Sequence, residues 1–253
     1  MIQWSKSDAR DVLLKVRRFG RILVYTISMY LVTHLIVFLY LFPIGTIRII
    51  LNRQNGCGVK RNVTGLLFAI IGKRPKVLGL ENVNPEKNYV IVSNYPGSYA
   101  GFALMNVFPD ASILVHSFLS RVPLVGFLLK STGAAFVQQK KFRRTKIAID
   151  SSLKNDQDKS VIILPEGGRS PDGSIRMFKR GFIYILRNSS KDLLLVTLRG
   201  FYSLKPLRRP YVDPDADLEI VIHKPIIRSA LENLTNDGIL KLAVETIREA
   251  YKP

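Results

Sequence analysis

The chain has 253 residues, a formal net charge of +19 and a sequence pI near 10.2. With 47% apolar and 23% charged residues it is not globally disordered, and its length suits one large domain or one domain with an appendage. The single cysteine, Cys57, excludes an internal disulfide, and no C-x-x-C or H-x-x-x-H spacing indicates a zinc site. The positive excess predicts an anionic partner. No basic run is interleaved with stacking aromatic residues, so a membrane surface or a phosphorylated substrate is favoured over nucleic acid.

The N-terminal part of the chain carries the features of a membrane-associated segment. Residues 1–21 are basic and partly amphipathic, which predicts a helix lying at a lipid headgroup surface. Residues 22–47 carry no formal charge with His34 counted as neutral, and about 20 apolar residues are enough to span a bilayer. Basic residues flank this run on both sides, Pro43 interrupts it, and a second apolar piece covers residues 63–72. A hairpin that dips into one face of the membrane, a single span, and a buried helix of a soluble protein therefore remain open.

Residues 73–76, K-R-P-K, mark the predicted boundary between this segment, residues 1–75, and a globular domain over residues 76–253. In that domain, short apolar runs alternate with segments of helical periodicity, which is typical of an α/β fold. We expect a layered mixed sheet flanked by helices. The predicted strands are residues 77–80, 89–93, 111–115, 134–137, 161–164, 193–198 and 218–223, and the predicted helices are residues 99–107, 123–130, 142–153, 179–188 and 235–251.

The most informative loop follows the predicted strand over residues 161–164, an apolar run that fits burial on both faces of a sheet. Pro165 has no N–H to donate, so the strand must end there, and residues 165–170 then read P-E-G-G-R-S. Glycine lets a backbone turn tightly and approach a ligand closely, and ligands of open α/β sheets bind at the carboxyl ends of strands. Glu166 and Arg169 therefore form a candidate site. The alternative is an ordinary strand-to-helix turn with a solvated ion pair.

Short motifs follow one another along the domain in a characteristic order. They are G-L-E-N at 79–82, V-I-V-S-N at 90–94, P-L-V-G at 123–126, G-A-A-F-V at 133–137, L-P-E-G-G-R-S at 164–170 and F-K-R-G at 178–181. Over about residues 77–225, this order resembles the 1-acylglycerol-3-phosphate acyltransferase family, the glycerophospholipid acyltransferases. The resemblance implies an α/β domain after a membrane-associated segment, and transfer of an acyl chain from acyl-CoA or acyl carrier protein to a lysophospholipid such as 1-acylglycerol 3-phosphate. It also implies a role in phospholipid biosynthesis at the cytoplasmic face of a membrane (the inner membrane in a bacterium), with no metal and no cofactor.

The chain departs from the family at the motif N-H-x-x-x-x-D, in which the resemblance makes His the general base and Asp the residue that orients it. Here Tyr95 stands at the His position and Ala100 at the Asp position. A tyrosine of pKa near 10 is about one part in a thousand ionised at pH 7, so it is a poor base. Loss of a general base typically costs about 10²–10⁴ in rate. A catalytically impaired domain that binds anionic lipid or assists another enzyme is therefore the alternative to an acyltransferase.

The binding residues of the family are better preserved than the catalytic pair. The resemblance makes Arg169 the ligand of the substrate phosphate, which a guanidinium contacts in bidentate fashion. Glu166 could hold that arginine or the glycerol hydroxyls in place. Lys179 adds positive charge to the site, and the alternative is that it is a solvated surface charge. We predict a substrate-binding set of Asn94, Ser98, Glu166, Gly167, Gly168, Arg169 and Lys179, and a catalytic role for Tyr95 and His116.

His116 is the candidate for a substitute base, because few side chains titrate near neutrality. It ends the predicted strand over residues 111–115. If the neighbouring strands are parallel, its side chain emerges at the same edge of the sheet as Asn94 and Arg169. We therefore expect His116 within about one side chain's reach of the cleft formed by Tyr95, Glu166 and Arg169. A surface or packing histidine is the alternative.

Overall fold

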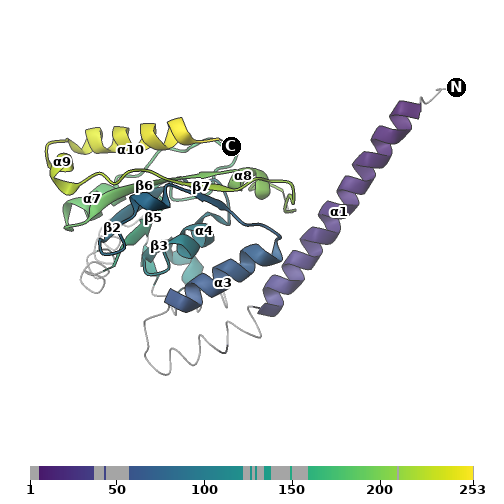
Figure 1. Ribbon diagram of the computed structural model, residues 1–253, viewed down its shortest axis with the longest axis horizontal. Coiled ribbons are helices and arrows are strands. Elements are labelled where there is room, and N and C mark those ends of the chain that lie inside the picture. Colours follow the sequence, from purple (N-terminus) through teal and green to yellow (C-terminus); the bar gives the residue numbers. More distant parts are fainter. Residues whose placement is uncertain are drawn as a thin grey trace.

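The structure is a computed structural model that describes residues 6–36, 43, 57–121, 126, 129, 134–137, 149, 159–209 and 211–252. Within these residues a seven-stranded sheet forms the centre of the domain, in the order β1-β7-β6-β2-β5-β3-β4 (Figure 1). β6 and β7 pair antiparallel, and the other neighbours pair parallel. The predicted mixed α/β sheet is thus confirmed. The strands are β1 (Lys76–Leu78), β2 (Tyr89–Ser93), β3 (Ser112–His116), β4 (Ala135–Val137), β5 (Val161–Ile163), β6 (Asp192–Arg199) and β7 (Glu219–Ile222).

Helices flank both faces of the sheet, as predicted. The described helices are α1 (Lys6–Ile36), α3 (Cys57–Ile70), α4 (Ala100–Val107), α7 (Gly181–Arg187), α8 (Phe201–Leu204), α9 (Arg228–Glu232) and α10 (Asn236–Ala250), with 3-10 turns η2 (Leu80–Asn82) and η3 (Ser117–Arg121). The helices predicted over residues 99–107, 179–188 and 235–251 are confirmed with small shifts at their ends. The helices predicted over residues 123–130 and 142–153 lie outside the described residues, apart from single positions.

Alternation along each central strand divides the core into two layers. Ile91 of β2 and Ile162 of β5 face the layer beneath α3, α4 and α8, whereas Val90 and Val92 face the layer beneath α7 and α10. All four side chains are fully buried, which explains why these strands are continuous apolar runs in the sequence. The sheet is therefore buried on both faces, and only its edges and strand ends are open to a ligand.

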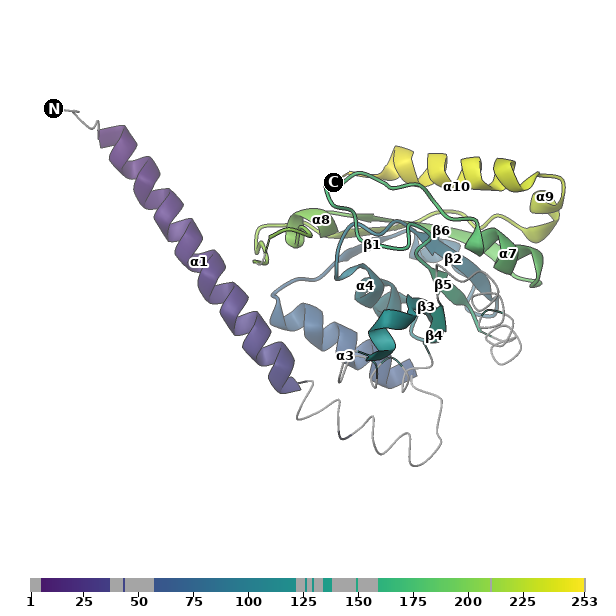
Figure 2. The same cartoon turned by 180° about the vertical axis from the view of Figure 1, so that it is seen from behind.

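The N-terminal segment forms one continuous helix, α1, where a basic helix followed by a separate apolar segment was expected. α1 projects from the domain at its N-terminal end, and it is tied to the loop before β7 near its middle (Figures 1 and 2). Arg21 forms an ion pair with Asp215 at 2.9 Å, and the Thr26 hydroxyl accepts the Val212 N–H at 3.1 Å. Apolar side chains stay exposed along its length: Val12, Leu13, Leu14, Val16, Phe19, Leu23, Val24, Ile27, Leu31 and Leu35.

Among the described residues, no helix combines the length and the apolar character that crossing a bilayer requires. The expected transmembrane span is therefore not supported there. Residues 37–56, which would carry the end of the apolar run and the turn of a hairpin, lie outside the described residues apart from Pro43. The second apolar piece, predicted over residues 63–72, belongs to α3 and packs Phe68 into the core of the domain.

Candidate active site

The candidate site lies where the parallel strands β2, β5 and β3 end side by side. β5 pairs with β2 on one side and with β3 on the other, so the three loops that follow these strands meet at one edge of the sheet. A cavity of about 850 Å³ opens there. Its volume lies within the range of about 300–1,000 Å³ that is usual for small-molecule sites. This is the location expected for a ligand of an open α/β sheet.

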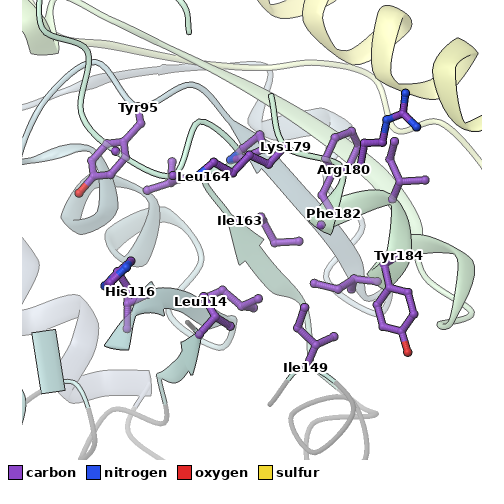
Figure 3. Close-up of a pocket in the computed structure, with 18 of the residues that line it drawn as sticks. Tyr95, Leu114, His116, Ile149, Ile163, Leu164, Lys179, Arg180, Phe182 and Tyr184 are labelled. Atoms are coloured by element: carbon purple, nitrogen blue, oxygen red, sulfur yellow. The ribbon is translucent and has the colours of Figure 1, made fainter. Parts of the chain in front are cut away.

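The cavity has a polar end, from which a mainly apolar arm leads away (Figure 3). Tyr95 and His116 lie at the polar end. Arg169 also lines the cavity, and its bond to Ser98 and its charge near Tyr95 place it at that end. Lys179 lies between the two ends, beside Leu164. Away from Tyr95 the lining is mainly apolar, with Leu114 of β3, Ile163 of β5, Phe182 of α7 and the separate residue Ile149. Arg180, Arg187 and Asn236 add polar groups to the lining. A ligand with an anionic head and one apolar chain fits this division.

Glu166 ties the loop after β2 to the loop after β5. Its side chain is 3% exposed. Its Oε1 accepts the Tyr95 N–H at 2.7 Å, and its Oε2 accepts the Arg176 N–H at 3.0 Å. Burial raises the pKa of Glu166, and these two N–H groups oppose that shift. Glu166 is not among the described residues that line the cavity. Its hydrogen bonds within the described residues go to the backbone of Tyr95 and Arg176 and not to Arg169.

Asn94 likewise uses its side chain within the protein. It is 1% exposed, its Nδ2 donates to the Leu198 carbonyl at 3.0 Å, and its Oδ1 accepts the Leu198 N–H at 2.8 Å. The amide therefore continues the hydrogen-bonding ladder between β2 and β6 by one residue past Ser93. The structure places Asn94 beneath the loop and away from the cavity lining, and its predicted contact with substrate stays a prediction.

Arg169 is oriented toward the polar end by the loop that carries Tyr95. Its Nη1 donates to the Ser98 hydroxyl at 2.8 Å. Gly167 and Gly168 line the cavity beside it. Gly167 has a φ of 67°, a conformation that glycine adopts without strain, and a Cβ at Gly168 would lie 2.9 Å from an Arg176 nitrogen. Both glycines thus let the backbone pass close to the ligand space.

Tyr95 reaches the cavity as a neutral phenol. Burial raises its pKa above the usual value, and the charge of Arg169 opposes that shift only in part. Its hydroxyl makes no hydrogen bond to the part of the chain that the structure describes, so it can donate one to a ligand. Ala100, the other replaced position, is fully buried at the start of α4 and packs in the core.

His116 lines the same cavity as Tyr95 and Arg169, at the carboxyl end of β3. Its Nδ1 accepts the backbone N–H of Phe118 at 3.0 Å. Because a neutral imidazole has one acceptor and one donor nitrogen, this bond assigns the proton to Nε2. In this arrangement His116 offers the ligand a donor, whereas a substitute base would need a free lone pair.

Two features of the site could not be found from the sequence. The apolar arm is built from residues such as Leu114 and Ile163, whose pattern is that of ordinary core strands. The backbone contacts of Glu166 depend on the fold, because one of its partners lies 71 residues away in the chain. The sequence indicates this apolar part of the cavity only through the position of these residues, which lie near the ends of strands that lead into polar loops.

Comparison with known proteins agrees with this geometry. A family model described as Acyltransferase matches residues 74–199, which covers β1 to β6 and every predicted site residue. Residues 74–199 therefore form an acyltransferase-family domain. Its resemblance to 1-acylglycerol-3-phosphate acyltransferases is supported by curated relatives of that name.

Three relatives illustrate the similarity. The 1-acyl-sn-glycerol-3-phosphate acyltransferase of Borreliella burgdorferi is 29% identical over 185 residues, covering 68% of this chain and 72% of that protein. The chloroplastic enzyme BAT2 of Brassica napus is 24% identical over 169 residues, which is 66% of this chain but only 49% of its own length. The crystal structure of the 1-acyl-sn-glycerophosphate acyltransferase PlsC from Thermotoga maritima superposes with a TM-score of 0.77 at 20% identity, covering 92% and 95% of the two chains. The last likeness establishes the shared fold.

Proposed function

We propose that this protein is a membrane-associated acyltransferase of phospholipid biosynthesis. It moves an acyl chain from a thioester of coenzyme A or acyl carrier protein to a hydroxyl of a lysophospholipid such as 1-acylglycerol 3-phosphate. The observation that carries the proposal is the cavity, whose polar end holds Arg169 and whose arm is mainly apolar, with Arg180 and Arg187 also in the lining. A guanidinium suits a phosphate monoester, and the apolar arm suits a single acyl chain. Acyltransferases of this name among the relatives support the choice of substrates.

The reaction requires the acceptor hydroxyl to attack the thioester carbonyl, with an oxyanion forming on the carbonyl oxygen. Hydrogen-bond donors aimed at such an oxygen lower the barrier. The Tyr95 phenol and the Nε2–H of His116 are the donors at the polar end of the cavity. Arg169 would hold the phosphate, and its bond to Ser98 fixes its direction.

We place the protein at the cytoplasmic face of a membrane, because the acyl donors of the family are cytosolic. α1 supports this location. Its exposed apolar side chains, among them Phe19, Leu23 and Leu31, share the helix with the exposed basic residues Lys15 and Arg17. Such a helix binds an anionic lipid surface through both its apolar area and its charge.

Binding of anionic lipid without turnover is the second candidate. The observation that favours it is that Tyr95, which stands at the position of the family's base, has a pKa raised by burial. Glu166, the nearby carboxylate, accepts two backbone N–H groups. This candidate predicts lipid binding that depends on Arg169 without any product.

The test uses the full chain in mixed micelles with 1-acylglycerol 3-phosphate and either acyl-CoA or acyl carrier protein thioesters. We expect diacyl product from at least one donor. Arg169→Ala should raise the KM for the acceptor about 10–100-fold, the loss of one or two charge-assisted hydrogen bonds. Arg248→Ala, an exposed arginine of α10 outside the cavity, is the matched control and should behave as the wild type. Arg169-dependent binding with no product from any donor would instead establish the second candidate.

A further inference from the structure

We propose that the lysophospholipid supplies its own base: its phosphate monoester takes the proton from the attacking hydroxyl, while Tyr95 and His116 act only as hydrogen-bond donors. The proposal rests on the acyl-transfer function above and narrows the acceptor to lysolipids with a dianionic phosphate monoester. A phosphodiester headgroup, such as that of a lysolipid esterified to an alcohol, would bind but would not be acylated at a comparable rate.

The first step of the argument is that, among the residues that the structure describes, the groups near Tyr95 that could take a proton are already engaged. Both carboxylate oxygens of Glu166 accept backbone N–H groups, at 2.7 and 3.0 Å. The Nδ1 of His116 accepts the Phe118 N–H at 3.0 Å, so the nitrogen left for the ligand carries the proton. The Tyr95 phenol is neutral, because burial raises its pKa.

The second step is the character of the lining. Of the described residues that line the cavity, none is Asp or Glu, whereas Arg169 and Lys179 bring positive charge to it. Hydrogen-bond donors at the polar end and cations along the lining make a receptor for an anion. A bound phosphate is therefore the group with a free lone pair closest to the reacting hydroxyl.

The third step is that a phosphate monoester is basic enough. Its second pKa is about 6, close to the value of about 6.5 for an imidazole, so it is largely dianionic at neutral pH. In 1-acylglycerol 3-phosphate the free hydroxyl and the phosphate sit on adjacent carbons, and a phosphate oxygen can reach the hydroxyl through a small hydrogen-bonded ring. Arg169 and Lys179 lower the basicity of the bound phosphate, so we expect slower transfer than a free imidazole would give.

The proton and the electrons balance along this route. As the hydroxyl oxygen forms its bond to the thioester carbonyl carbon, its proton passes to a phosphate oxygen. The carbonyl oxygen becomes an oxyanion that accepts hydrogen bonds from the Tyr95 O–H and the His116 Nε2–H. When the intermediate collapses, the C–S bond breaks and the leaving thiolate takes the proton back from the phosphate. The products are the ester and the thiol, and the phosphate ends as it began.

Two acceptors with the same chain test the proposal: 1-acylglycerol 3-phosphate and its phosphate methyl ester, which binds as an anion but lacks the second ionisation. We expect kcat for the methyl ester to be lower by about 10²–10⁴, the usual effect of losing a general base. Competition binding should show that both acceptors occupy the cavity. Comparable kcat values for both would overturn the proposal and leave the acyltransferase function standing. Transfer to neither acceptor would overturn the function itself.

The pH dependence separates the phosphate from His116. The dianion becomes more abundant as the pH rises, so log kcat should rise to a plateau. Because Arg169 and Lys179 lower the pKa of the bound phosphate, the inflection should lie below the value of about 6 for a free phosphate monoester. His116→Gln keeps an N–H donor but cannot act as a base, and the inflection should persist in this variant with a modest fall in rate. His223→Gln, a histidine that bonds Thr197 outside the cavity, is the matched control. An inflection that disappears in His116→Gln, with a rate loss of about 10²–10⁴, would make His116 the base and refute the proposal.

Discussion

Asn94→Asp is the substitution that tests most sharply whether the predicted site residue Asn94 serves the fold. The change preserves the shape of the side chain and its acceptor oxygen. It replaces the Nδ2 donor, which lies 3.0 Å from the Leu198 carbonyl, by a carboxylate oxygen. Asn94 and Leu198 are 1% and 0% exposed, so water cannot relieve the contact between two acceptors. We expect the variant to fold with markedly lower stability.

The magnitude follows from the groups involved. One neutral hydrogen bond is lost, at about 0.5–1.5 kcal/mol, and a buried carbonyl is left unsatisfied, at about 1–3 kcal/mol. A buried carboxylate that lacks a partner adds to this cost, so the total is about 3 kcal/mol or more. For a chain of this size each kcal/mol lowers the melting temperature by about 2–4 °C, which predicts a decrease of about 6–12 °C.

Urea denaturation followed by circular dichroism measures the change in the free energy of unfolding. Asn106→Asp is the matched control. Its Nδ2 also donates to a backbone carbonyl, that of Arg61 at 3.1 Å, but this bond is exposed to solvent. The same Nδ2 donates to the Thr64 hydroxyl at 3.0 Å, and a hydroxyl can donate to the carboxylate that replaces the amide. We expect the control to lose about 1 kcal/mol or less. If the two variants lost equal stability, the ladder role assigned to Asn94 would be wrong.

Two further predictions concern the loop after β2 and the end of β7. Gly97→Ala should lower the free energy of unfolding, measured by urea denaturation, by about 1–3 kcal/mol, because the new Cβ would lie 2.5 Å from the Phe201 carbonyl oxygen. Gly181→Ala is the control and should be neutral or slightly stabilising, because no atom lies within 4 Å of its Cβ position. Equal effects of the two substitutions would contradict the close packing at Gly97. Burial, with the nearby charge of Arg199, lowers the pKa of His223, so the unfolded chain binds the proton more readily below about pH 6.5. Wild type should therefore lose more stability than His223→Gln as the pH falls from 7 to 5, and parallel pH curves would exclude this linkage.

The sheet was predictable because its central strands are buried on both faces. Val90, Ile91 and Val92 form a continuous apolar run, and so do the residues of β5. A run of this kind needs no knowledge of its partners to be recognised. It was not predictable that α1 is one continuous helix, because the basic residues up to Arg21 and the apolar residues after it suggest two different environments. Helical periodicity continues through both, and charge alone does not end a helix.

The candidate site was predictable only in part, for a related reason. Tyr95, His116 and Arg169 each follow a strand that could be recognised, and parallel strands bring their carboxyl ends to one edge. The partners of Asn94 and Glu166 depend on tertiary structure, because the Leu198 backbone lies 104 residues from Asn94. A polar residue in a sequence motif is known by its type, but the direction of its side chain depends on the fold. The motif therefore located the site, and the fold decided which of its polar groups face the ligand.

Tyr95 and Ala100, the two positions that the resemblance aligns with the family's catalytic pair, are linked by burial. Ala100 is fully buried in the core at the start of α4, whereas Tyr95 lies in the loop that opens toward the cavity. An aspartate at position 100 would be tolerable only with a charged or donor partner, which an imidazole at position 95 would supply. Once the phenol of Tyr95 replaces the imidazole, a carboxylate at position 100 would lose that partner and a small apolar residue becomes the stable choice. On this argument, the loss of the base and the loss of its orienting carboxylate would be one physical change, as the proposed role of Tyr95 as a hydrogen-bond donor requires.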